Sequence, residues 1–319
     1  MKLPQDTVFP THPYIQDRSI HASYRSDQTT ALGSSTVASM SSSTAFTKWM
    51  TWVSPQTRGR VFNAMLTRSN HICCFFHIPE QTMRDLRESV QKNAPQDMRF
   101  TINDVITAYL TIVVAQAKAK VSAAWWSKPL PSMIRSLVGK DFGKSDSYVA
   151  VVYINQRARL SLPNIDKYMG NMAIGKSFPL SWDQVHEDPT DRVLAALAQK
   201  INQAITATDE QYVGQFGHLL DREPDNFMRL IACTMDTKNK LMTSNQSRFP
   251  HYGVDFGSGI PSMVRHAPHA FSDLAYVMPA NPATGGGYEI EFNLAPEVAL
   301  QVVQNDTWMK LADRYDCYL

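Results

Sequence analysis

One acidic residue in the C-terminal third is the first candidate for chemistry or for structural anchoring. Asp255 lies in the sequence Val-Asp-Phe-Gly-Ser-Gly-Ile, so apolar residues and two glycines flank its carboxylate. If this carboxylate is buried, it requires a cationic partner or several N–H donors, because an unpaired buried charge is unfavourable. Gly257 and Gly259 allow the backbone to turn tightly. An Asx turn at the end of a loop is equally consistent with the spacing.

Hydroxyl side chains and two short strands surround this acidic segment in the sequence. Thr243 and Ser244 follow a short apolar run, and a polar connection leads from them to Asp255. Residues 274–279 form a short apolar run, and residues 288–294 alternate apolar and polar side chains, which predicts two strands. The connection between them contains three consecutive glycines, which favour a turn.

These elements, in this order, resemble the C-terminal signature of the BAHD acyltransferases, plant and fungal enzymes that transfer acyl groups from coenzyme A thioesters. The matching segments are Thr243–Ser244, Arg248–Pro250, Asp255–Gly257 with Gly259, Pro261, Tyr276–Pro279, Gly286–Gly287 and Glu289–Leu294. Two positions depart from the family pattern, since Asn245 and Ser258 stand where the family often or usually has Trp. The resemblance implies an α/β fold with a mixed sheet and flanking helices, like one chloramphenicol-acetyltransferase-type domain.

The resemblance also implies roles for the residues of the signature. A structural motif, away from the substrate, consists of Asp255, Phe256, Gly257 and Gly259. The acceptor side of a substrate channel is expected to be lined by Thr243, Ser244 and Phe249. The partner of Asp255 is expected to be Arg157 or Arg159, which follow a strand predicted over residues 145–154; the alternative is that these arginines form a solvated strand end.

Acyl transfer to an alcohol or amine requires a base that takes the proton of the acceptor as it attacks. In the family this base is the histidine of a His-x-x-x-Asp-Gly segment, and none of the nine histidines here lies in one. His251 and His269 are each followed by an aspartate four residues later, but not by the glycine. We therefore expect no catalytic residue in these 319 residues. The alternative is a complete enzyme that uses His251 or His269.

The order of the motifs predicts which part of a family member is present. His12–Ile20 resembles the Asp-Arg-Ser segment that follows the catalytic motif in the family. The resemblance thus covers about residues 12–319 and corresponds to the second half of a complete member. We expect residues 1–70 to be an interdomain connector or a remnant of a truncated N-terminal domain, and residues 71–319 to form the C-terminal acyltransferase-like domain. Such a half exposes an interdomain face that a protein partner could cover.

Periodicity and capping residues predict the remaining elements. Residues 72–78 read as a strand because they are apolar and end before Pro79. Thr101 and Asp104 form a capping box at the start of a buried helix. Further helices are predicted over residues 80–90 and 100–120, from Asp188–Pro189 onward and from Pro296 onward, with residues 313–319 fraying.

Composition narrows the class of protein. A net charge of +2 argues against nucleic acid as a partner. No apolar run reaches the roughly 18 residues of a membrane helix, and the N-terminus lacks the apolar region of a secretory signal. The four cysteines have neither metal-ligand spacing nor the density of a disulfide framework, which indicates buried thiols in a reducing compartment. We expect a cytoplasmic protein without a metal site and without a membrane partner.

The sequence therefore leads to one function and one alternative. By resemblance the chain is an acyltransferase of secondary metabolism that moves an acyl group from acyl-CoA to an alcohol or amine of a small metabolite, in truncated form and without the catalytic histidine. Acyl-CoA would be a co-substrate, and no cofactor would be bound. The alternative is a non-catalytic pseudoenzyme, a binding subunit or a gene fragment.

Overall fold

The computed structural model describes residues 71–126, 147–161, 165, 171–214, 216, 239–267 and 273–318. The connector expected over residues 1–70 and His269 lie outside the described residues, and the domain boundary near residue 70 stays a prediction. The chain divides into two compact units. The described residues of the larger unit are 71–126, 147–153, 175–206, 239–267 and 273–318, and those of the smaller unit are 154–161, 165, 171–174, 207–214 and 216.

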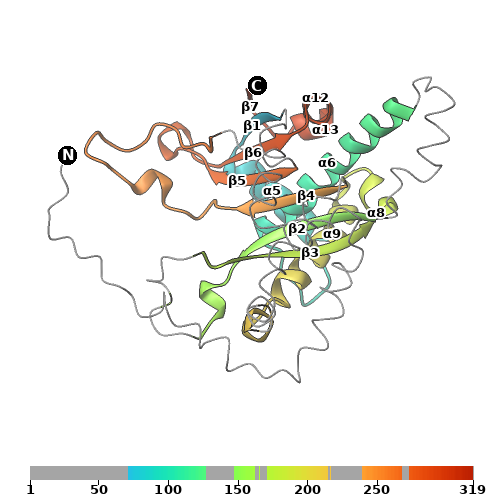
Figure 1. Ribbon diagram of the computed structural model, residues 1–319, viewed down its shortest axis with the longest axis horizontal. Coiled ribbons are helices and arrows are strands. Elements are labelled where there is room, and N and C mark those ends of the chain that lie inside the picture. The colour runs from blue at the N-terminus through green and yellow to red at the C-terminus, as the bar shows by residue number, and fades with distance from the viewer. Residues whose placement is uncertain are drawn as a thin grey trace, which may run out of the picture. The chain divides into compact units, whose positions relative to one another are not determined.

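A seven-stranded mixed sheet organises the larger unit (Figure 1). Its strands are β1 (Ile72–Ile78), β2 (Ser147–Asn155), β3 (Ala173–Ser181), β4 (Lys240–Asn245), β5 (Leu274–Pro279), β6 (Tyr288–Leu294) and β7 (Arg314–Tyr318). Their order in the sheet is β3-β2-β4-β5-β6-β1-β7. Strands β2, β4 and β5 run parallel to one another, whereas β5, β6, β1 and β7 pair antiparallel. The last strand of the chain therefore lies at one edge, beside the first described strand.

Helices flank this sheet, as the sequence predicted. They are α5 (Glu80–Gln91), α6 (Ile102–Trp126), α8 (Trp182–His186), α9 (Asp191–Thr206), α12 (Pro296–Val303) and α13 (Asp306–Met309). Within the described residues, short 3₁₀ turns include η3 (Arg157–Arg159), η5 (His251–Gly253) and η6 (Pro282–Thr284). Helix α6 contacts α5, α8, α9, α12 and strand β4, so it is the central helix of this layer.

The central helix forms where local signals and burial agree. The backbone N–H of Thr101 donates to Asp104 Oδ2 at 2.8 Å, and the N–H of Asp104 donates to Thr101 Oγ1 at 3.2 Å, which is the predicted capping box. By length and composition, residues Ile102–Ser122 could cross a membrane, but 72% of the most apolar window is buried inside the protein. Packing within the fold accounts for this apolar composition.

An aromatic cluster ties the sheet to the C-terminal helices. The indole of fully buried Trp308 lies edge-on to the rings of Phe76 and Phe292, with centroid distances of 5.3 and 5.7 Å. Tyr109 of α6 contacts the same indole at 5.8 Å. Residues far apart in the sequence thus share one core.

The turn between β5 and β6 depends on the predicted glycines. Asn281 Oδ1 accepts the N–H of Ala283 at 2.8 Å and starts η6. Gly285, Gly286 and Gly287 then have φ angles of 106°, 65° and 94°. A Cβ atom on Gly287 would approach Ile78 O to 2.6 Å, so this glycine also permits close contact between two backbones.

Two predictions at element ends are wrong. Helix α9 begins at Asp191, after the predicted start at Asp188–Pro189, because Thr190 Oγ1 accepts the N–H of Val193 and caps the helix there. The C-terminal residues do not fray. They form β7, which pairs antiparallel with β1 from His77↔Arg314 to Cys73↔Tyr318.

Candidate functional site

The Asp255 segment forms a turn on the surface. Asp255 Oδ1 accepts the N–H groups of Gly257 at 2.7 Å and Gly259 at 2.9 Å. These two glycines have φ angles of 96° and 97°, which explains why the turn needs them. Asp255 is exposed, as are Val254 and Phe256, and Phe256 is 88% exposed. The geometry is therefore that of the Asx-turn alternative, in which backbone donors and water compensate the charge.

The arginines expected to pair with Asp255 have contacts within the smaller unit. Arg159 Nη1 donates to the carbonyl of Thr208 at 3.1 Å, and the backbone N–H of Arg157 donates to Asn155 Oδ1 at 3.1 Å. Since Asp255 belongs to the larger unit, the ion pair with Arg157 or Arg159 stays a prediction.

The two expected channel hydroxyls lie on opposite faces of the sheet. Thr243 is 1% exposed and stands in register with Ala275 of β5, so it belongs to the buried face that packs on the helices. Ser244 is half-buried on the other face, opposite Tyr276. The expectation that both line a channel is wrong for Thr243, because successive side chains of a strand alternate between faces. Phe249 is exposed and edge-on to His251. The channel roles of Ser244 and Phe249 stay predictions.

The face that carries Ser244 is a polar one. Register places a row of side chains across it, from Tyr153 through Ser244, Tyr276, Glu291 and Phe75 to Asp316. We call this the polar face. Glu291 is only 1% exposed, so a carboxylate is buried on the sheet at the centre of this row. Such a group requires a polar partner.

His266 supplies that partner from the loop after the Asp255 turn. Its Nδ1 lies 3.0 Å from Glu291 Oε2, and its backbone N–H donates to the same oxygen at 3.2 Å. The imidazole stacks on the ring of Tyr276 with a centroid distance of 4.0 Å. Burial, and secondarily the Glu291 carboxylate, raise the pKa of Tyr276 to about 12, so this phenol stays protonated at neutral pH. The buried Glu291 carboxylate thus orients a half-buried imidazole on the polar face.

Sequence spacing does not reveal His266 and Glu291. They do not follow the pattern of a histidine with an aspartate four residues later, because they are 25 positions apart and meet only through the sheet. One available signal was Glu291 itself, a charged residue in an otherwise strand-like run. His251, which the sequence did single out, lies in η5, and its aspartate, Asp255, bonds to glycine amides.

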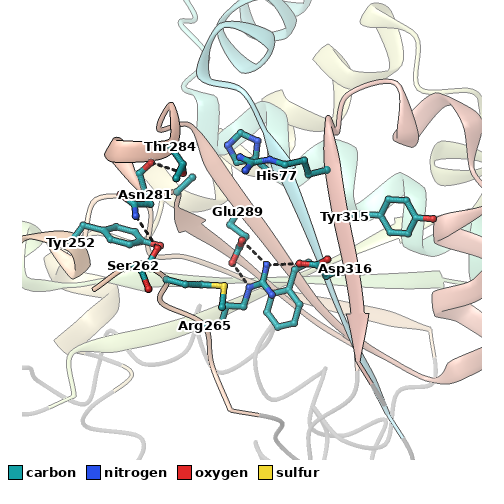
Figure 2. A pocket seen from close by; sticks show the side chains of 13 residues that line it. His77, Tyr252, Ser262, Arg265, Asn281, Thr284, Glu289, Tyr315 and Asp316 are labelled. Atoms are coloured by element: carbon teal, nitrogen blue, oxygen red, sulfur yellow. Dashed lines mark hydrogen bonds and ion pairs between the residues drawn. The ribbon is translucent and has the colours of Figure 1, made fainter. Parts of the chain in front are cut away.

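A pocket lies beside the polar face, between the same loop and strands β1, β6 and β7 (Figure 2). Arg265 is one of the residues that line it. The guanidinium donates to Glu289 through Nε at 2.9 Å and through Nη2 at 3.0 Å, donates to Asp316 at 3.1 Å, and lies 4.1 Å from the centre of the Phe75 ring. His77 contacts Asp313 and the carbonyl of Gly286. Arg265, Glu289 and Asp316 are thus paired with one another, and His77 and Arg314 both contact Asp313. This pairing favours a neutral polar ligand over an anion.

A buried ion pair fixes the start of β5. Lys118 Nζ of α6 lies 2.7 Å from Asp273 Oδ1, and it also donates to the carbonyl of Lys240 at 2.9 Å. The two side chains are 9% and 12% exposed. Asp273 has a φ of 62°, and its own backbone joins β4 and β6 through Met242 and Asn293. Asp273 is therefore a buried structural carboxylate of this region, whereas Asp255, the residue that the sequence singled out, is exposed.

No metal centre is visible in the described part of the chain. Among those residues, no group of three or more His, Cys, Asp or Glu side chains is placed to hold a metal ion.

Comparison with known proteins identifies the fold. A family model described as the Transferase family matches residues 78–308. TRI101 of F. sporotrichioides, solved with coenzyme A and T-2, is similar with a TM-score of 0.59 and 16% identity, over 78% of this chain and 52% of that one. Vinorine synthase is similar with a TM-score of 0.51 and 16% identity, over 77% and 49%.

F. graminearum TRI101, solved with coenzyme A and deoxynivalenol, gives a TM-score of 0.57 and 16% identity, over 78% of this chain and 50% of that one. No curated protein sequence matches the chain significantly. The chain spans about half the length of these solved structures.

Proposed function

Because this chain belongs to the BAHD acyltransferase family, we propose that its 319 residues supply the acceptor-side wall of an acyl-CoA-dependent acyltransferase but no catalytic base. The observation that carries the proposal is the family match over residues 78–308 in a sequence that lacks His-x-x-x-Asp-Gly. Without a base to take the acceptor proton, this stretch of chain alone does not turn over.

The polar face supports the assignment of the acceptor side. Ser244 and Tyr276 carry half-buried hydroxyl groups on the sheet, next to a pocket in which Arg265 is paired with Glu289 and Asp316. Such a surface suits a small metabolite that carries hydroxyl or amine groups. Two of the similar structures were solved with T-2 and with deoxynivalenol, which agrees with an acceptor from secondary metabolism.

We also propose a cytoplasmic location, where acyl-CoA is available.

A steady-state assay tests the proposal. The chain is incubated with several acyl-CoA donors and with a panel of alcohols and amines, and release of free coenzyme A is followed. We expect no release above the rate without protein. Turnover that disappears in His251→Ala, His266→Ala or His269→Ala would overturn the proposal, because it would mean that this chain contains its own base.

The second candidate function is a non-catalytic binding subunit, and the buried Glu291–His266 pair on a polar face favours it. Calorimetric titration with coenzyme A and with T-2 tests whether this chain binds either ligand. Binding of T-2 that Ser244→Leu weakens, and that Ser258→Leu on the exposed turn does not, supports a ligand site on the polar face. Absence of both binding and turnover leaves the remaining alternative, a gene fragment.

A further inference from the structure

Two cysteines from opposite ends of the described chain face each other at the edge of the sheet. In the antiparallel ladder of β1 and β7, Cys74 stands directly opposite Cys317. Their sulfur atoms are 2.7 Å apart. A disulfide bond is about 2.0 Å long, and directly opposed residues of neighbouring strands have the Cα separation that such a bond requires. The ladder thus holds the two thiols close to bonding geometry.

The surroundings of the two thiols differ. Cys74 is 2% exposed beneath the helices, whereas Cys317 is exposed. Cys73 points to the opposite face of β1, where its Sγ contacts Asn293 Oδ1 at 3.6 Å. Although Cys73 is the sequence neighbour of Cys74, it does not compete for Cys317. The thiol of Cys317 is therefore accessible to a reagent, and the buried thiol of Cys74 is in contact with it.

We propose that Cys74 and Cys317 are a redox modification site, at which a low-molecular-weight disulfide such as oxidised glutathione converts the two thiols into a reversible disulfide between β1 and β7. This inference does not depend on the proposed acyl transfer.

The reaction proceeds by two thiol–disulfide exchanges. The thiolate of exposed Cys317 attacks oxidised glutathione, which forms a mixed disulfide and releases one glutathione thiolate. The thiolate of Cys74 then attacks the Cys317 sulfur of that mixed disulfide and releases the second glutathione. Two protein thiols lose two protons and two electrons, and one oxidised glutathione becomes two reduced molecules.

The second exchange requires the thiolate form of buried Cys74. Burial raises the pKa of the Cys74 thiol well above its ordinary value, and the hydrogen bond from Cys317 adds to this effect. The reactive species is the thiolate. Ring closure should therefore accelerate as the pH rises, since the thiolate fraction of Cys74 increases.

The bond would fix the edge strand that completes the pocket. Strand β7 contributes Tyr315 and Asp316 to the pocket lining, and Asp316 binds Arg265 from the loop above. A covalent link at the neighbouring position 317 prevents β7 from separating from β1. Oxidation would thus stabilise the pocket, and reduction would allow the strand to open.

Peptide mapping tests the site directly. Because Cys73 and Cys74 share a proteolytic peptide, the Cys73→Ser variant is treated with oxidised glutathione, digested without reduction and analysed by mass spectrometry. We expect a peptide that contains Cys74 linked to one that contains Cys317, and its loss after treatment with a thiol reductant. Glutathione that remains on Cys317, or a Cys317–Cys317 link between two chains, would refute the proposal.

Hydrogen exchange provides a second measurement on the unsubstituted chain. Amides of residues 314–318 should exchange at least several-fold more slowly after oxidation. The Cys317→Ser variant, changed at an exposed position, should show no such slowing under the same treatment. Equal exchange rates for the oxidised and reduced chain would contradict a link between β1 and β7.

Discussion

The buried ion pair between Lys118 and Asp273 permits a quantitative prediction. We consider Asp273→Asn, which removes the charge and keeps the shape. Asparagine also tolerates the left-handed backbone conformation of this residue, with its φ of 62°, so the change introduces little strain. What it removes is the carboxylate 2.7 Å from the Lys118 ammonium, in a pair whose side chains are only 9% and 12% exposed.

The size of the expected loss of stability follows from the Lys118 ammonium, which stays buried in the variant. The Lys118 ammonium keeps its bond to the carbonyl of Lys240 but loses its carboxylate partner. Removal of one partner from a buried pair costs on the order of 3–5 kcal/mol, whereas an exposed pair costs below about 1 kcal/mol. We expect Asp273→Asn to lower the free energy of unfolding by roughly 3–5 kcal/mol. Asp255→Asn is the matched control, and its exposed carboxylate predicts a loss below about 1 kcal/mol.

Urea denaturation at neutral pH measures both losses. The pH dependence provides a further test. Burial lowers the pKa of Lys118, and Asp273 opposes this shift. Without Asp273 the pKa falls further, so the folded state binds fewer protons than the unfolded state over the range below the ordinary lysine value of 10.5. The variant should therefore regain stability as the pH rises through this range. A loss equal to that of Asp255→Asn, without pH-dependent recovery, would refute the reasoning.

Three further predictions concern the frame around the site, each measured by chemical denaturation. Gly287→Ala should destabilise the protein more than Gly285→Ala. Both glycines have a positive φ, but a new Cβ atom at Gly287 would meet backbone atoms, whereas nothing lies within 4 Å of one at Gly285. Thr101→Ala should cost about 1 kcal/mol by removing the cap of α6, and an unchanged midpoint would contradict the capping role. Trp308→Ala should cost about 3–5 kcal/mol through the cavity it leaves, and a loss below 1 kcal/mol would mean that the aromatic cluster collapses around it.

The sequence predicted those elements whose signals are local. The strands at residues 72–78, 274–279 and 288–294 have the predicted bounds, because alternation, proline and glycine act within a few residues. Strand β7 was missed since its sequence, Arg-Tyr-Asp-Cys-Tyr, is polar and lies at an edge of the sheet, where its backbone pairs with β1. The partner, and not the segment itself, determines this strand.

The candidate site was less predictable because burial depends on what covers a residue. Asp255, set among apolar residues in the sequence, is exposed, while Asp273 is buried by α6. Because side chains of a strand alternate between its faces, Ser244 and Thr243 had to lie on opposite faces of the sheet. Their shared hydroxyl chemistry nevertheless suggested that both line the substrate channel, although Thr243 is buried. The Glu291–His266 contact joins a strand to a loop and has no signature in sequence spacing.

A single-turnover experiment tests most directly the central claim that these residues lack a catalytic base. The chain, at a concentration above that of a labelled acetyl-CoA, is mixed with excess alcohol and amine acceptors, and acylated products are measured by mass spectrometry over hours. We expect the same trace of product with the chain and with a variant in which His251, His266 and His269 are all alanine. Product that forms with the unsubstituted chain and is lost in that variant would contradict the account.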